Sequence, residues 1–134
     1  MTTLTQTWSE TPVRSTARSR SKVATAFLWT LQILSAVMFI FAGSTKLSGD
    51  PAMVQAFGAI GLGQWFRYLT AGIEIVSAIL LLVPAVASYG AAALAVTMVG
   101  AIITHLFIIG GNPTPAIVLL AFTLTIAWAR RGDR

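Results

Sequence analysis

The chain has 134 residues, of which 56% are apolar and only 10% are charged. Soluble domains of ordinary composition hold roughly 45–50% apolar and about 25% charged residues. No Asp, Glu, Lys or Arg lies between Glu74 and Arg130, so a soluble fold would leave much of that apolar segment in water. The composition therefore excludes a water-soluble protein and indicates a single membrane domain.

The residue types that are missing exclude several kinds of chemistry. The chain has no cysteine, which excludes thiolate nucleophiles, disulfide exchange, iron–sulfur clusters and cysteine zinc sites. Its one histidine, His105, argues against a histidine-rich metal centre within one chain. The net charge of +5 comes mostly from two short basic ends, which membrane topology explains without nucleic acid. We expect no metal site and no nucleic-acid partner.

Four apolar segments follow a stretch rich in Thr, Ser and Arg, residues 1–22, which we expect to be a disordered basic tail. The first apolar segment is longer than the 7–15 residues of a signal-peptide core, so we expect it to be retained. Proline and glycine end the later segments. The sequence predicts an all-α polytopic membrane protein, a four-helix bundle at 23–130 with spans at about 23–47, 66–83, 89–109 and 115–129, and a basic tail at 131–134.

The basic residues predict how this bundle is oriented. They cluster before the first span and after the last: Arg14, Arg18, Arg20, Lys22, Arg130, Arg131 and Arg134. Positive charge collects on the cytoplasmic side of membrane proteins, so both termini are expected there. An even number of spans is then required, and four satisfies it. We expect a multi-pass protein of the cell (plasma) membrane.

The connection between the first two spans, residues 48–65, has its own helical signal. Asp50 and Pro51 are typical of an N-cap followed by the first helical position. Apolar residues then recur at helical spacing until the glycines Gly58, Gly61 and Gly63. We expect a short amphipathic helix in the outer interface, either a lid over the bundle or a linker that dips into lipid.

Ionisable side chains are costly inside a membrane, so each one needs a reason. The chain direction places Lys46 near the outer end of the first span, Glu74 below the outer end of the second, and His105 below that of the third. Three helices thus carry an amine, a carboxyl and an imidazole to the outer half of the bilayer. We predict that Glu74, His105 and Lys46 are the catalytic residues of a polar pocket.

Further residues share the polar, small-residue stripes of these helices and are predicted to bind substrate: Gln32, Gly43, Arg67 and Thr70. Structural interpretations stay open for several of them. Lys46 can snorkel to the interface and Arg67 can anchor the helix there. Glu74 can form a purely structural ion pair, and His105 and Gln32 can form hydrogen bonds between helices.

Three sequence segments resemble the DoxX-like family, of the DoxD-like superfamily of small four-helix membrane proteins. They are FIFAGSTKL in the first span, GIEIVSAILLLVP in the second and MVGAIITHLF in the third, within a resemblance that covers Trp29 to Arg130. The resemblance implies a four-helix membrane bundle. It also implies that the characteristic positions of the family are Gly43, Lys46, Glu74 and His105 in this chain.

The same resemblance implies a link to redox chemistry, because relatives include membrane subunits of thiosulfate:quinone oxidoreductases and partners of other redox enzymes. Our first hypothesis is an accessory or anchoring subunit of a redox complex, with a quinone in the polar pocket and no cofactor visible in the chain itself. The second is a stand-alone isomerase, cyclase or epoxide-opening enzyme that uses Glu74 and His105 as acid and base. The third is a small-solute or proton-coupled carrier. The expected partners are the lipid bilayer, a redox enzyme and a second copy of the chain.

Overall fold

A computed structural model describes residues 20–133. Within that range every regular element is helical, which confirms the all-α prediction. The long helices are α1 (Lys22–Leu47), α3 (Trp65–Leu81), α4 (Ala87–Thr104) with the π-helical turn η1 (His105–Ile109), and α5 (Thr114–Arg130). A short helix, α2 (Pro51–Ile60), lies between α1 and α3, and the 3-10 turn η2 (Arg131–Asp133) follows α5. The long helices begin and end close to the four apolar ranges given above.

The predicted basic tail at 1–22 lies outside the described residues except for its last three. Arg14 and Arg18 therefore cannot be placed, and Arg134 at the other end of the chain is also outside the described range. Ser21 caps α1, because its side chain accepts a hydrogen bond from the Ala24 amide. Lys22 is already helical, so α1 begins one residue before the predicted span.

The short helix α2 begins as its sequence predicts. The Asp50 side chain accepts from the Ala52 amide, and Pro51 occupies the first turn. Gly61 ends the helix with a φ of 84°, a left-handed conformation that glycine adopts without steric cost. Gly58 was also expected to end the helix, but it lies inside α2, because a single glycine in a packed helix costs only about 1 kcal/mol.

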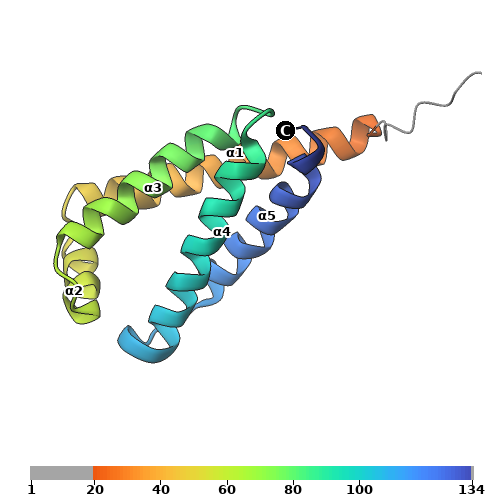
Figure 1. Cartoon of the computed structure of the whole chain (residues 1–134). Coiled ribbons are helices and arrows are strands. Elements are labelled where there is room, and N and C mark those ends of the chain that lie inside the picture. Colours follow the sequence, from red (N-terminus) through yellow and green to blue (C-terminus); the bar gives the residue numbers. More distant parts are fainter. Residues whose placement is uncertain (1–19, 134) are drawn as a thin grey trace, which may run out of the picture.

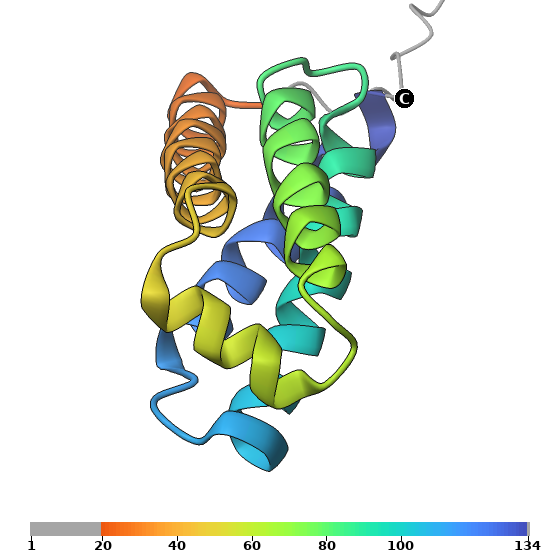
Figure 2. The same cartoon turned by 90° about the vertical axis from the view of Figure 1, so that its left-hand side faces the viewer.

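The long helices form two pairs. α1 packs on α3, α3 on α4 and α4 on α5, whereas α1 and α5 touch over a smaller area. The two pairs, α1/α3 and α4/α5, meet at the end that carries the start of α1 and the end of α5 (Figure 1). They separate towards the other end, where α2 crosses in front of the bundle and η1 lies beside it (Figure 2). We call the first end the terminal end and the second the distal end.

Small residues allow the helices to approach closely. A Cβ atom at Gly43 would lie 2.6 Å from Ile75 Cγ1 and 3.2 Å from the Ala71 carbonyl oxygen, so glycine is needed where α1 meets α3. Gly90 plays the same role between α4 and α3, where a Cβ atom would lie 2.7 Å from the Ser77 carbonyl oxygen. The hydrophobic core includes the fully buried side chains Phe39, Leu81, Leu94 and Ile126.

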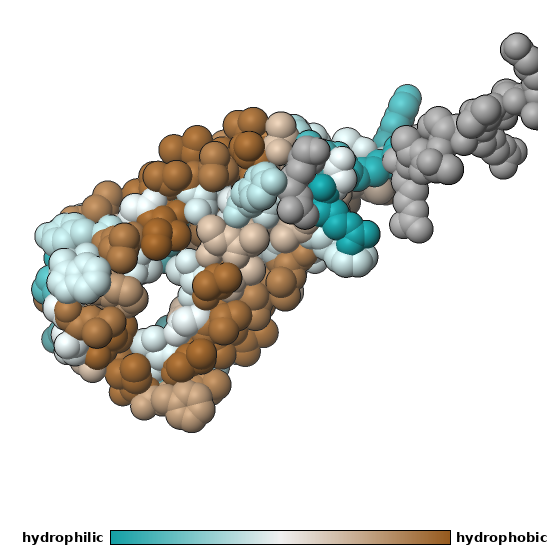
Figure 3. Space-filling model, viewed as in Figure 1, coloured by the Kyte–Doolittle hydropathy of each residue, from teal (hydrophilic) through white to brown (hydrophobic). Residues whose placement is uncertain are grey.

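The outer surface of the bundle is apolar. Large hydrophobic side chains are exposed on all four long helices, among them Phe27, Val76, Val96, Phe107 and Trp128. Apolar residues also dominate the face in Figure 3. Two helical segments, α1 and the continuous stretch Ala87–Ile109, are long and apolar enough to cross a membrane. This surface suits lipid contact and is too large to be an ordinary soluble surface.

Candidate functional site

Lys46 and Glu74 form an ion pair inside the bundle. Lys46 lies in the last turn of α1 and Glu74 at the middle of α3, and the Lys46 Nζ atom is 3.1 Å from Glu74 Oε2. The Glu74 side chain is only 2% exposed and that of Lys46 is 13% exposed. Lys46 also contacts the Ala42 carbonyl oxygen at 3.5 Å, which holds the ammonium group against its own helix. Lys46 does not simply snorkel outward, because its charge is directed to the carboxylate.

The ion pair borders a cavity of about 420 Å³ at the distal end. Its wall is formed by residues of α1, α2, α3, α4, η1 and α5. Apolar residues make up most of it, and the polar ones are Lys46, Thr70, Glu74, Thr97, Thr104 and His105. Binding pockets for small ligands span about 300–1,000 Å³ and combine an apolar wall with a few polar groups. The cavity therefore has the size and composition of a site for a small lipophilic molecule.

His105 reaches the same cavity from the distal end of α4. It opens the π-helical turn η1, and its Nδ1 atom lies 2.8 Å from the Ala101 carbonyl oxygen. Because a carbonyl can only accept, Nδ1 carries the hydrogen and Nε2 of the neutral ring is left as an acceptor. Single π-helical turns inside α-helices occur often at functional sites. The structure thus brings all three predicted catalytic residues to one cavity.

The four residues expected to bind substrate do not share one location. Thr70 lines the cavity, although its hydroxyl donates to the Phe66 carbonyl oxygen at 2.8 Å. Gly43 is buried between α1 and α3 and serves their packing. Arg67 is only 5% exposed and lies beside the cavity, where it donates to Gln64 and to the Lys46 carbonyl oxygen.

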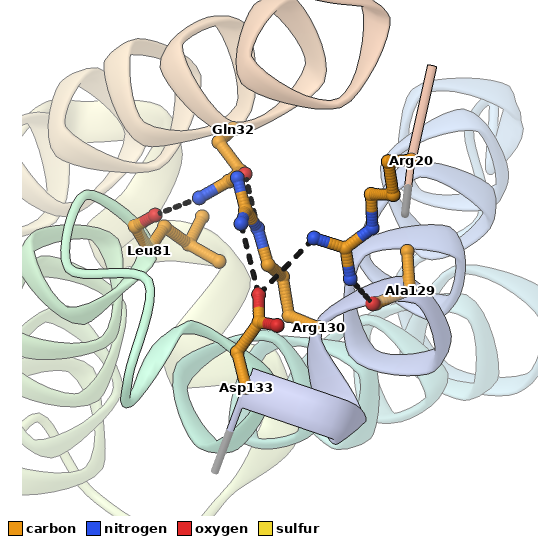
Figure 4. A network of polar contacts seen from close by, with 6 residues as sticks. All are labelled: Arg20, Gln32, Leu81, Ala129, Arg130 and Asp133. Carbon is orange, nitrogen blue, oxygen red and sulfur yellow. Dashed lines mark hydrogen bonds and ion pairs between the residues drawn. The ribbon is translucent and has the colours of Figure 1, made fainter. Parts of the chain in front are cut away.

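Gln32 lies at the terminal end, far along α1 from Lys46, in a separate polar network (Figure 4). Its amide nitrogen donates to the Leu81 carbonyl oxygen at 2.6 Å, and its amide oxygen accepts from Arg130 Nε at 2.9 Å. Arg130 also pairs with Asp133 at 2.9 Å, and Asp133 in turn contacts Arg20 at 3.2 Å. This network ties α1, α3 and α5 together, so Gln32 is placed as a structural residue and not at the cavity.

One feature of the site was left open by the sequence, and another was not predicted. Helix α2 supplies part of the cavity wall through Met53, Phe57 and Ile60. Gln64 joins this helix to α3, because its amide nitrogen donates to the Val54 carbonyl oxygen at 3.1 Å while its oxygen accepts from Arg67 at 2.8 Å. The apolar period of α2 signalled an apolar face, but nothing in the sequence showed which surface that face covers.

The architecture and the site together define a class: a small all-helical membrane protein with a buried ion pair and an imidazole on one internal cavity. The chain belongs to the DoxX-like family, whose model matches residues 30–130. Gly43, Lys46, Glu74 and His105 all fall within the matched range.

The chain is also similar to a Bacillus subtilis (strain 168) protein described as "Putative oxidoreductase CatD". The two are 31% identical over 74 residues, which is 55% of this chain and 55% of the relative. The chain thus spans about half the length of the curated relative that it matches. No solved structure matches the chain.

Proposed function

We propose that the chain is a multi-pass protein of the plasma membrane in which α1, α3, α4 with η1, and α5 all cross the bilayer. The 17 residues of α3 and of α5 each extend about 26 Å, somewhat less than a hydrocarbon core of about 30 Å. Local thinning of the bilayer accommodates such a mismatch at modest cost. The cluster of Arg20, Arg130 and Arg131 at the terminal end supports a cytoplasmic location for both termini.

Within that membrane we propose an accessory subunit of a redox complex whose distal cavity binds the headgroup of a quinone. The observation that carries this proposal is the Lys46–Glu74 ion pair, which lies with His105 on the wall of an otherwise apolar cavity. The Lys46 ammonium group is a hydrogen-bond donor for a quinone carbonyl. The Glu74 carboxylate and His105 Nε2 are acceptors for the hydroxyl groups of a quinol.

Reduction of a quinone to a quinol takes two electrons and two protons. In this proposal the electrons come from a redox enzyme bound to the chain, and the side chains at the cavity wall pass the protons. Sequence similarity to a protein described as an oxidoreductase supports the link to redox chemistry. The role of this chain is then to hold the headgroup in a dry pocket and to orient its oxygens.

Equilibrium binding of decylubiquinone to the purified chain in lipid nanodiscs tests the proposal. We expect saturable binding to the unmodified chain and a loss of about tenfold or more in Glu74→Gln, because the variant no longer holds the Lys46 ammonium group in place. The matched control is Asp50→Asn, the same carboxylate-to-amide change at an exposed helix cap that asparagine also fills. Absence of saturable binding, or equal affinity in Glu74→Gln and the control, would contradict it.

A second candidate function is a stand-alone enzyme that uses acid–base chemistry on a lipophilic substrate. The observation in its favour is that Glu74 and the Nε2 acceptor of His105 belong to one largely apolar cavity. Purification of the chain distinguishes the two candidate functions. A subunit is inactive alone and co-purifies with a redox enzyme, whereas a stand-alone isomerase or cyclase turns over its substrate without any partner.

A further inference from the structure

The distal end of the cavity is covered on the side away from the bundle. Helix α2 contributes Met53, Phe57 and Ile60 to the wall, and Phe57 is buried there against Phe66 of α3, with ring centroids 5.8 Å apart. A helix that places its apolar residues on a cavity closes that side to water. Of the two roles predicted for this segment, the position of α2 matches the lid.

Arg67 and Gln64 hold α2 over the cavity, where this helix forms its roof. Arg67 donates to the Lys46 carbonyl oxygen at the end of α1 and to Gln64 Oε1, and Gln64 donates to the Val54 carbonyl oxygen within α2. The Arg67 side chain also stacks on Tyr68, with its guanidinium carbon 4.4 Å from the ring centroid. One buried guanidinium group thus connects α1, α2 and α3, so opening the roof requires several hydrogen bonds to break together.

The cavity is open on its flank instead. Three residues that line it are also exposed on the outer surface: Ile73 of α3, and Val96 and Gly100 of α4. Val96 is 73% exposed, and a Cβ atom at Gly100 would meet no heavy atom within 4 Å. Figure 3 shows the opening between the two helix pairs, bordered by residues of apolar and of intermediate hydropathy. A second, apolar groove of about 330 Å³ between α1 and α5 includes neither Lys46 nor Glu74.

We infer that the ligand of this cavity is a lipid-resident molecule that enters from the side, with its polar headgroup at Lys46 and Glu74 and its hydrocarbon tail leaving through the slot between α3 and α4. The inference rests on the proposed function and specifies it further, because it requires a tailed quinone and a lateral path. The apolar rim formed by Ile73 and Val96 suits a hydrocarbon chain. The ion pair at the inner end of the slot suits the carbonyl oxygens of the headgroup.

Filling the slot tests this inference. In Gly100→Phe the new phenyl ring occupies the open space beside the cavity, whereas Gly72→Phe places the same ring on the exposed surface of α3, away from the cavity. A Cβ atom added at either glycine would meet no heavy atom within 4 Å, so both variants are expected to fold. Two probes are compared at equilibrium in nanodiscs: decylubiquinone, and the tail-less 2,3-dimethoxy-5-methyl-1,4-benzoquinone. The concentration of each probe is expressed as its mole ratio to lipid in the nanodisc.

We expect Gly100→Phe to weaken decylubiquinone binding by about tenfold or more and to leave the tail-less probe within about twofold, because only the tail must pass the filled slot. Gly72→Phe should match the unmodified chain with both probes. Equal affinities of Gly100→Phe and Gly72→Phe for decylubiquinone would contradict the lateral path but not the quinone site. The same holds if Gly100→Phe weakens the binding of both probes equally. If the unmodified chain binds neither probe, the proposed quinone site is contradicted together with the lateral path.

Discussion

At the scale of single residues, the polar side chains of the cavity and those of the Gln32 network lie at opposite ends of the bundle. Lys46, Glu74 and His105 line the distal cavity, whereas Gln32 and Arg130 belong to a network at the terminal end. A buried ion pair is weak evidence for stability, because desolvation offsets most of its Coulombic gain. Its location on a ligand-sized cavity is what the proposed quinone site requires. The terminal network pairs the Leu81 carbonyl oxygen and Arg130 Nε with Gln32 and is explained by structure.

Replacing Gln32 should affect stability and leave ligand binding unchanged. Gln32→Leu removes the partners of Arg130 Nε and of the Leu81 carbonyl oxygen, both of which are buried. Unsatisfied buried groups of this kind cost about 1–3 kcal/mol each, so we expect a clear fall in the unfolding temperature in detergent. Decylubiquinone affinity should stay within about twofold of the unmodified chain. A tenfold loss of affinity in a folded variant would show that Gln32 takes part in ligand binding.

Asp133 makes the stability of the terminal end dependent on pH. The hydrogen bond from Arg130, together with the contact from Arg20, lowers the pKa of Asp133 below its ordinary value. A lowered pKa means that the ion pairs stabilise the fold above about pH 4, the unperturbed range of an aspartate, and that this contribution is lost as the pH falls through the folded pKa.

The variant Asp133→Asn isolates this effect. We expect it to lower stability at pH 7 by at most about 1 kcal/mol, because Asp133 is partly exposed to solvent. The difference between the variant and the unmodified chain should shrink when thermal unfolding is measured at progressively lower pH. A difference that stays constant down to pH 3 would exclude the carboxylate as its source.

At the scale of elements, the apolar segments and their breakers predicted the helices well, but not all contacts. Asp50, Pro51 and Gly61 predicted both ends of α2, because capping is decided by neighbouring residues. Gln32 and Lys46 share one stripe of α1 but lie about four turns apart, so a common face did not mean a common site. The π-helical turn at His105 was not predicted. It reflects a local change in the backbone hydrogen-bond pattern of the helix, which the apolar composition of the segment does not indicate.

The contact between α1 and α3 should be sensitive to one methyl group. Gly43→Ala places a Cβ atom 2.6 Å from the Ile75 side chain and 3.2 Å from a backbone oxygen, so Ile75 must move and the contact between the two helices must give slightly. Overpacking of this kind costs about 1–3 kcal/mol. Gly72→Ala is the matched control, because its Cβ atom has free space on the same helix pair. Thermal unfolding that is equal in the two variants would show that the close approach does not limit stability.

At the scale of the whole molecule, composition was sufficient to predict an all-helical membrane protein. Chain direction then predicted that Lys46, Glu74 and His105 share one level of the bundle, and the cavity contains all three. The pairing of Gln32 with Arg130 could not be predicted from the sequence, because the two residues are 98 positions apart and no local pattern links them. For α2 the sequence left two positions open, a lid over the bundle or a linker in lipid, since loop lengths do not determine which surface a short helix covers.

The proposed topology is testable because the chain has no cysteine of its own. Single cysteines are introduced at Leu62, after α2 at the distal end, and at Gly132, in η2 at the terminal end. Both positions are exposed. In intact cells a membrane-impermeant maleimide should label Leu62→Cys, and it should label Gly132→Cys only after the membrane is opened. Labelling of both variants, or of Gly132→Cys alone, in intact cells would contradict cytoplasmic termini.

The most direct test of a shared cavity is photoaffinity mapping with an azido-quinone in native membranes, followed by mass spectrometry of the labelled peptides. We predict adducts confined to the segments that line the cavity, residues 39–46, 53–60, 66–74 and 96–109. Excess decylubiquinone and the variant Glu74→Gln should both reduce this labelling. Adducts spread over the lipid-facing surface and the terminal end, and unchanged in Glu74→Gln, would contradict a quinone site at Lys46, Glu74 and His105.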